Sequence, residues 1–107
     1  MFAKTPSPPY YMVSFTSTTN SNISSDYEIV ADRMVELAKQ QPGYLGHESA
    51  RDASGFGITI SFWKDRISIS NWKKNCEHQI AQERGKSEFY SHFETRIAKV
   101  EHEYSNN

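Results

Sequence analysis

Two predicted strands joined by a tight turn constrain the fold more than any other part of this chain. Residues 56–63 alternate in character, as a strand with two different faces does. One face carries Phe56, Ile58, Ile60 and Phe62, and the other carries Gly57, Thr59, Ser61 and Trp63. The partner strand is predicted over Tyr44–Arg51, and Gly55 in the connecting turn can adopt the positive φ that closes such a hairpin. The sequence therefore predicts an antiparallel hairpin.

The residues before the hairpin predict one strand and one helix. Tyr10–Thr16 (YYMVSFT) is aromatic and β-branched, which favours a strand, and the polar run Ser17–Ser24 predicts a loop. A helix is expected to begin at Ser25, because Ser25 and Glu28 match a capping box. It is expected to end just before Pro42, since proline disfavours helix in the residue that precedes it.

A second helix and a last strand are predicted after the hairpin. Asp65 is a suitable N-cap, and Gly85 is expected to end the helix. Its buried face should carry Ile69, Trp72, Cys76 and Ile80, which recur at helical spacing. Beyond it the sequence predicts a short helical turn over Lys86–His92 and a strand over Phe93–Tyr104.

The order strand, helix, strand, strand, helix, strand predicts an α+β fold of the ferredoxin-like type, β-α-β-β-α-β. Right-handed crossovers place both helices on one face of a four-stranded antiparallel sheet. Residues 10–104 are expected to form a single domain, residues 1–9 an extended lead-in, and residues 105–107 a frayed tail. The face without helices is predicted to carry Thr59 and Trp63 and to be covered by a second copy of the chain.

Composition narrows the class of protein. The 107 residues include many aromatic side chains: six Phe, six Tyr and two Trp. One small domain cannot bury all of this apolar surface, which favours a homodimer. A net charge of −1 without a basic run argues against nucleic acid as a partner. Neither a signal peptide nor a membrane-spanning run is found, and the lone cysteine, Cys76, excludes an internal disulfide. A cytoplasmic location is therefore expected.

Several segments together resemble the antibiotic biosynthesis monooxygenase family of small dimeric α+β barrels. They are TPSPPYY, PGYLGHESARD, GFGITISFW, NWKKNCEHQIAQERG and FYSHFETRIAKVEHEY. The resemblance implies a dimeric α/β barrel and a pocket between the helices and the sheet for a polycyclic aromatic compound or a haem. It also implies, for cofactor-free members, that a deprotonated phenolic substrate reduces dioxygen itself. The sequence has neither a glycine-rich dinucleotide fingerprint nor a metal-ligand cluster, so no cofactor and no metal are expected.

The strongest catalytic candidate is His78, which can take or give a proton near neutral pH. It belongs to a polar helical stripe beside the apolar one, made of Asn71, Asn75, His78 and Gln82. The plainer alternative is a histidine on the helix surface. Predicted substrate contacts are Trp72, Phe62, Tyr90, Ser14 and Asn75.

Other polar residues are given structural roles. Glu48 is expected to pair with Arg51 or Arg96, because a charge in a covered strand needs a partner. Cys76 lies on an apolar helix face without an activating neighbour. The remaining histidines, His47, His92 and His102, lack the spacing of a metal site.

Together with these residues, the resemblance implies a cytoplasmic homodimer that acts as a cofactor-independent monooxygenase on a small aromatic or polycyclic molecule. One alternative is a haem-binding or haem-degrading monooxygenase. Such relatives place an asparagine on the first strand, which Tyr10–Thr16 lacks, and a ligating histidine further beyond the helix tryptophan than His78 is from Trp72. The other alternative is a non-catalytic dimeric ligand-binding or stress-related module, since one fold hosts many functions.

Overall fold

Four strands and two helices follow one another in the predicted order in the computed structural model, which describes residues 1–19, 26–82 and 90–106. The side chains of residues 26–31, 77–82, 90 and 91 are outside this description. The elements are β1 (Tyr10–Thr19), α1 (Asp26–Lys39), β2 (Tyr44–Arg51), β3 (Phe56–Trp63), α2 (Arg66–Gln82) and β4 (Tyr90–Val100). The α+β ferredoxin-like prediction is confirmed.

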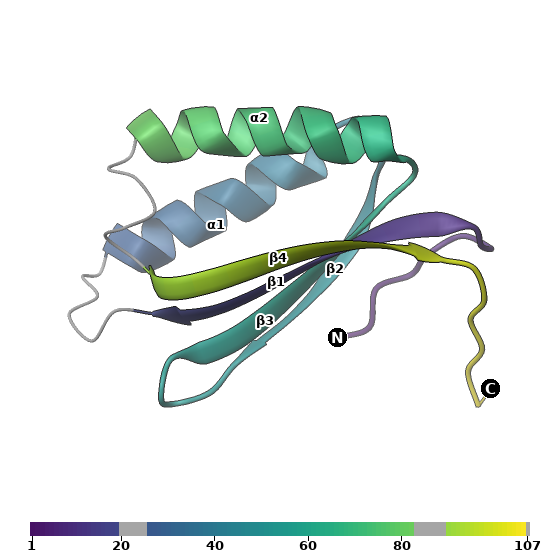
Figure 1. Ribbon diagram of the computed structural model, residues 1–107, viewed down its shortest axis with the longest axis horizontal. Coiled ribbons are helices and arrows are strands. Elements are labelled where there is room, and N and C mark those ends of the chain that lie inside the picture. Colours follow the sequence, from purple (N-terminus) through teal and green to yellow (C-terminus); the bar gives the residue numbers. More distant parts are fainter. Residues whose placement is uncertain (20–25, 83–89, 107) are drawn as a thin grey trace.

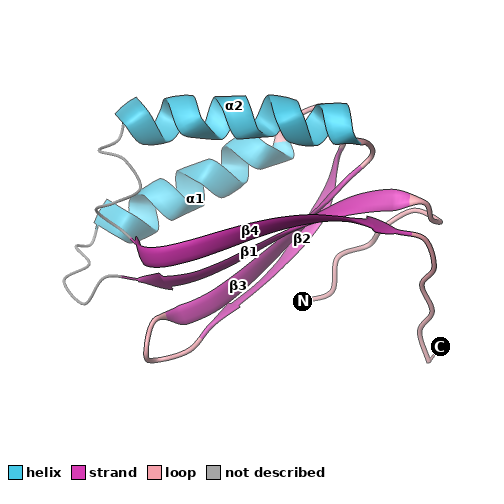
Figure 2. Ribbon diagram, in the orientation of Figure 1, coloured by secondary structure: helices cyan, strands magenta, loops and turns pink. Residues whose placement is uncertain are grey.

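The four strands form one antiparallel sheet in the order β2-β3-β1-β4. Both helices lie on the same side of this sheet, as Figures 1 and 2 show. The sheet therefore has a helix-facing side and an open side. Neither of the helices in the described ranges is long and apolar enough to cross a membrane.

The central hairpin matches its prediction at both strands and at the turn. Gly55 has φ +96°, a conformation that glycine adopts without strain. The Asp52 carboxylate accepts hydrogen bonds from the amides of Ser54 and Phe56, at 2.9 and 3.1 Å, and from the Ser54 hydroxyl. These bonds, the Ser54 hydroxyl first, lower the pKa of Asp52. The turn thus fixes the register of the hairpin through its own side chains.

Three strand boundaries differ from the prediction. β1 continues to Thr19, because Ser17 and Thr18 pair with both neighbouring strands. β4 begins at Tyr90 and ends at Val100, so the helical turn predicted up to His92 and the strand predicted up to Tyr104 are wrong at those ends. Pairing with β1 decides both limits. The predicted capping box at Ser25 and helix end at Gly85 fall outside the described residues.

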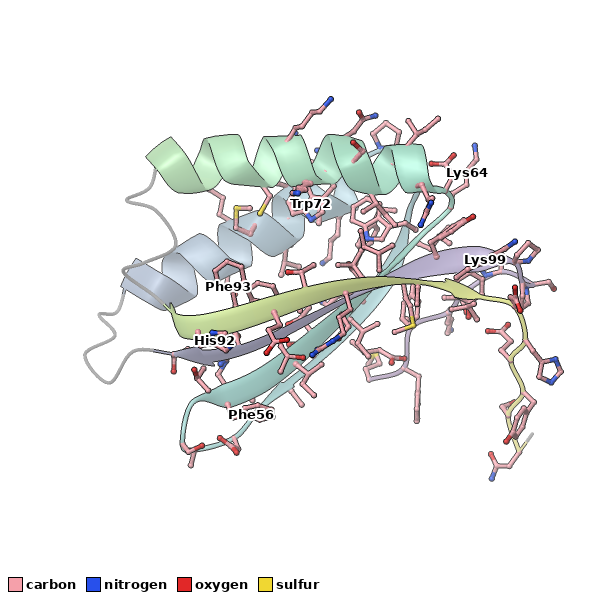
Figure 3. The ribbon with its side chains drawn as sticks, viewed as in Figure 1. Phe56, Lys64, Trp72, His92, Phe93 and Lys99 are labelled. Atoms are coloured by element: carbon pink, nitrogen blue, oxygen red, sulfur yellow. The ribbon has the colours of Figure 1, made fainter. Side chains whose placement is uncertain are left out.

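The predicted assignment of the two sheet faces is wrong. Trp63 is fully buried, and its ring stacks on Trp72 of α2 with 6.1 Å between centroids. Thr59 shares the helix-facing side with Trp63, whereas Phe56 and Ile58 lie on the open side and are 46% and 40% exposed. Figure 3 shows Trp72 pointing toward the sheet and Phe56 pointing away from the helices. Strand alternation groups residues by face, but contacts with α2 decide which face is covered.

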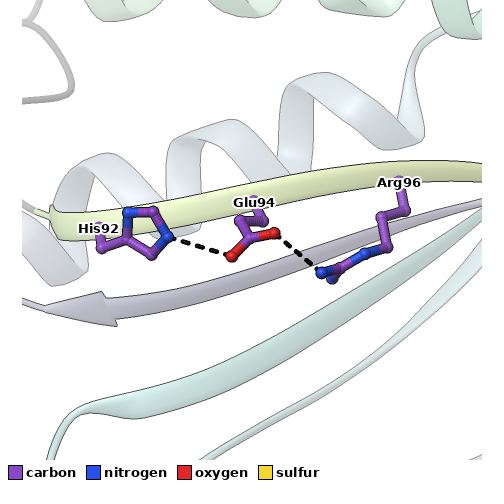
Figure 4. Close-up of polar contacts among 3 residues, drawn as sticks. All are labelled: His92, Glu94 and Arg96. Atoms are coloured by element: carbon purple, nitrogen blue, oxygen red, sulfur yellow. Dashed lines mark hydrogen bonds and ion pairs between the residues drawn. The ribbon is translucent and has the colours of Figure 1, made fainter.

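Glu48 does not form the predicted charge pair. It accepts a hydrogen bond from the amide of Ala3 at 3.0 Å, and its side chain lies on the opposite face from that of Arg51. Arg96 instead donates to Glu94 at 2.8 Å, and Glu94 contacts His92 at 3.1 Å on its other side (Figure 4). The His92 hydrogen bond and the Arg96 charge lower the pKa of Glu94. The charges on the open side of β4 therefore pair within their own strand.

The start of α2 is fitted closely against the loop that precedes β2. The Asp65 carboxylate accepts from the amide and the hydroxyl of Ser68, at 2.8 and 2.6 Å, which confirms Asp65 as the N-cap. Gly43 has φ +86°, and its carbonyl accepts from the Lys64 amide at 2.8 Å. A Cβ atom added at Gly43 would overlap the Ser68 side chain. Only glycine meets both demands at this position.

We therefore expect Gly43→Ala to lower the free energy of unfolding by about 2–4 kcal/mol, from backbone strain and overlap together. Urea denaturation followed by circular dichroism measures this loss. Gln40→Ala, at an exposed position in the same loop, is the control and should change stability by less than about 0.5 kcal/mol. Equal stability of the two variants would contradict the account of Gly43.

Candidate functional site

Among the described side chains, the tightest packing between the helices and the sheet is found where α2 begins. Trp63 and Ile69 are buried where α2 begins, and they are the buried apolar side chains between the layers within the described ranges. Further along β3 from Trp63, Thr59 is half-buried. Its hydroxyl forms a solvent-exposed hydrogen bond of 2.9 Å with the Ser49 hydroxyl. The helix-facing surface around Ser49 and Thr59 therefore stays accessible. This surface is the candidate site.

Aromatic rings stand at both ends of this surface. Trp63 and Trp72 stack at one end, and the Tyr44 and Trp63 rings form a T-shaped pair with 5.6 Å between centroids. Toward the other end, Phe15 and Phe93 stack at 5.4 Å. Figure 3 shows Phe93 projecting from β4 toward the helices. Aromatic pairs of this kind offer flat apolar walls for a ligand.

Polar side chains line the floor between these rings. They are His47, Ser49, Thr59 and Ser61, which we call the polar strip. Trp63 Nε1 donates to Ser61 Oγ at 2.8 Å, and Ser61 lies directly across the strand pair from His47. Hydroxyl and imidazole groups among aromatic walls can orient an oxygen substituent of a flat ligand.

Tyr44 and His47 form a pair that alternation along a regular strand does not predict. Residues three apart in a strand face opposite ways, yet Tyr44 Oη lies 2.5 Å from His47 Nδ1. The register shifts between Tyr44 and Gly46, and Gly46 has φ +153°. This irregularity turns both side chains to the helix-facing side. The glycine at position 46 is the sequence signal that could have indicated it.

Burial raises the pKa of Tyr44, which keeps its hydroxyl neutral. A neutral hydroxyl can either donate to or accept from the imidazole, depending on the tautomer of His47. The hydrogen bond can therefore form with either tautomer of His47.

Arg51 closes the far end of the surface. Its guanidinium reaches over Gly57 and donates to the Ser17 hydroxyl at 2.8 Å, to the Ser17 carbonyl at 3.3 Å and to the Gly55 carbonyl. A Cβ at Gly57 would meet Arg51 Cζ at 2.7 Å. The missing side chain at Gly57 thus makes room for a cross-strand clamp, and Arg51 is engaged in structure.

The sequence-predicted site residues do not all gather beneath the helices. Trp72 does, through its contact with Trp63. Phe62 and Ser14 lie on the open side, where the Tyr10 and Phe62 rings form a T-shaped pair with 5.8 Å between centroids. Their predicted place in a pocket beneath the helices is therefore corrected, for the same reason as the two faces.

The remaining predicted residues are placed only in part. Asn75 and Cys76 are half-buried on α2. His78 lies in α2 and Tyr90 opens β4, but both side chains are outside the described part of the chain. Among the described residues, no three His, Cys, Asp or Glu side chains gather as metal ligands.

A small hollow of about 220 Å³ lies elsewhere, at the outer edge of β2. Met1, Phe2, Glu48 and Ser49 line it. It borders the lead-in segment, and it shares Ser49 with the polar strip but touches none of the aromatic walls.

Comparison with known proteins gives a consistent result. The model of the antibiotic biosynthesis monooxygenase family matches residues 11–84. YqjZ, an uncharacterised protein of Bacillus subtilis, is 48% identical over 99 residues, which span 92% of this chain and 86% of YqjZ.

Solved structures share the fold at low sequence identity. SnoaB, a cofactor-independent oxygenase from Streptomyces nogalater, superimposes with a TM-score of 0.67 at 13% identity, covering 92% of this chain and 98% of SnoaB. A protein from Shewanella oneidensis gives a TM-score of 0.72 at 6% identity, covering 86% and 91%.

Proposed function

Because this chain belongs to the antibiotic biosynthesis monooxygenase family, we propose that it is a cofactor-independent monooxygenase for a small, flat aromatic or polycyclic substrate. It would act in the cytoplasm as a homodimer. The substrate would lie between the helices and the sheet.

One observation carries this proposal: the polar strip lies between two aromatic pairs on an accessible surface. Flat rings bind between aromatic walls, and a few placed polar groups fix their orientation. Trp63 with Trp72 and Phe15 with Phe93 supply the walls. The hydroxyls of Ser49 and Thr59 stay exposed between them and are available to an oxygen substituent of the substrate. This arrangement suits a hydroxylated aromatic compound.

The chemistry asks the protein for orientation and for proton exchange. A phenolate is electron-rich and can reduce dioxygen itself, so the chain must stabilise the anion and move protons. We assign proton exchange to His78 of α2, which follows half-buried Asn75 by three positions and shares its helical stripe. Trp72 and Asn75 would contact the substrate from the helix side, and Tyr90 from the start of β4.

The homodimer is supported by the open side of the sheet. Phe56 and Ile58 expose apolar side chains there, next to the half-buried Ile60. A second copy laid on this side would remove these side chains from water. The candidate site lies on the opposite side of the sheet, so dimer formation would leave it accessible.

Oxygen uptake with a panel of hydroxylated naphthalenes and anthracenes tests the proposal. The chain should consume dioxygen only with substrate, and His78→Ala should lower kcat by about 10²–10⁴-fold. His102→Ala, at an exposed position after β4, is the control and should retain full activity.

Three results would contradict the proposal in different ways. Uptake unchanged in His78→Ala would remove the role of His78. Saturable binding of these compounds without oxygen uptake would indicate a ligand-binding module. A saturable shift of the Soret band on adding hemin, with no uptake of the aromatic compounds, would indicate a haem protein.

A further inference from the structure

The Tyr44–His47 pair is a titratable pair at the candidate site to which the proposed function has given no role. His47 is half-buried on the helix-facing side of β2, and its Nδ1 is engaged by Tyr44 Oη at 2.5 Å. Its Nε2 has no hydrogen-bond partner among the residues described. We infer that His47, held by Tyr44, accepts the proton of the substrate hydroxyl. This inference rests on the proposed function.

The surroundings of the pair fix the orientation of the imidazole. The Tyr44 ring forms a T-shaped pair with buried Trp63. The irregularity at Gly46 directs the Tyr44 and His47 side chains to the same side of the sheet. Because Tyr44 occupies Nδ1, the Nε2 atom is the one left for a ligand. An oriented base of this kind needs little reorganisation when it takes a proton.

Neighbouring groups suit a base that becomes positively charged. Tyr44 stays neutral because burial raises its pKa, so its oxygen can accept from Nδ1–H. This direction leaves Nε2 of the neutral imidazole without a proton and is kept when Nε2 takes one. The carboxylate of Glu48 is on the other side of the sheet and binds the Ala3 amide. The new charge would therefore be stabilised by a hydroxyl dipole and by the anion that the substrate becomes.

The step itself is a simple proton transfer. The substrate O–H bond breaks, the N–H bond forms at His47 Nε2, and the electron pair stays on the substrate oxygen. The ring carrying that oxygen would lie along Trp72 with the oxygen toward β2, beside Ser61. This inference narrows the proposed substrate class to flat phenols whose hydroxyl is at the edge of the ring system. His78 would then serve the later return of a proton to reduced oxygen.

A chromogenic phenol tests the inference without requiring turnover. The probe is 7-hydroxycoumarin, a flat bicyclic phenol whose anion absorbs at longer wavelength than the neutral form. Mixed with the full chain under nitrogen, at a pH where the free probe is neutral, it should bind largely as the phenolate. The His47→Gln variant should still bind the probe, but the amount of bound phenolate should fall at least about tenfold. Tyr44→Phe, which removes only the orienting hydroxyl, should give an intermediate fraction.

His102→Gln is the matched control and should behave as the unmodified chain, and thermal denaturation of each variant confirms that it is folded. Equal phenolate in His47→Gln and in the unmodified chain would overturn the inference. So would binding of the probe only in its neutral form. If His47→Gln kept full phenolate while oxygen uptake still depended on His78, the proposed function would stand without this role for His47. Failure of oxygen uptake with every phenol would instead remove the proposed function itself.

Discussion

Replacing Trp63 by alanine is expected to lower the free energy of unfolding by about 3–5 kcal/mol. Its side chain is fully buried, stacks on Trp72 and forms a T-shaped pair with Tyr44. Removing it would also leave Ser61 Oγ without its indole donor. Domains of this size are stable by only about 5–15 kcal/mol, so the loss is a large share of the total. Urea denaturation followed by far-ultraviolet circular dichroism measures it without depending on tryptophan fluorescence.

Two further variants separate burial from ring stacking. Trp63→Phe keeps a large ring in place and should lower the free energy of unfolding less than Trp63→Ala does. Trp72→Ala removes a side chain that is only half-buried, so its cost should also be smaller. A Trp63→Ala variant that unfolds at the same urea concentration as Trp72→Ala would contradict the view that Trp63 seals the two layers.

The central hairpin could be predicted to the residue because its signals are local. Alternation over residues 56–63, the hydrogen-bonding side chain of Asp52 and the positive φ of Gly55 act within a few positions of one another. The limits of β4 could not be predicted in the same way. They depend on pairing with Thr19 and Tyr10 of β1, which are distant in sequence. Local patterns therefore define elements more reliably than their ends.

The inverted faces have one physical cause. The row from Phe56 to Phe62 is the more apolar of the two, which favours placing it under the helices. The contact between Trp63 and Trp72 decides otherwise, and it joins residues from two different elements. With Trp63 facing the helices, strand alternation carries Phe62 and, through pairing, Ser14 to the open side. The error in the candidate site thus follows directly from the error in the faces.

Trp72 was predictable because helical spacing groups it with Ile69, which is buried. The Tyr44–His47 pair was not, because it depends on an irregularity in β2 that breaks the period of two. Features of this kind often occur where a side chain must be aimed at a site. A regular strand would have placed one of these two side chains on the open side.

The substitution Ile58→Lys is expected to dissociate the proposed homodimer. Ile58 lies on the open side of β3, opposite Ala50 of β2 and Thr16 of β1, and is 40% exposed in the single chain. At the centre of two facing sheets, Ile58→Lys would bury a charge without a partner. The charged residues of β4 already pair among themselves, so they offer it little compensation. The dissociation constant should rise at least about 100-fold, which is about 2.7 kcal/mol.

Ile67→Lys is the matched control, because Ile67 is 72% exposed on α2 and not on the sheet. The same change of charge there should leave self-association unaltered. Sedimentation velocity over a range of concentrations distinguishes the two variants, and circular dichroism confirms that both are folded. If the unmodified chain sedimented as a single copy at micromolar concentration, the homodimer would be wrong. If Ile58→Lys remained a dimer, the copies would have to meet through another surface, and the exposed row on β3 would need a different explanation.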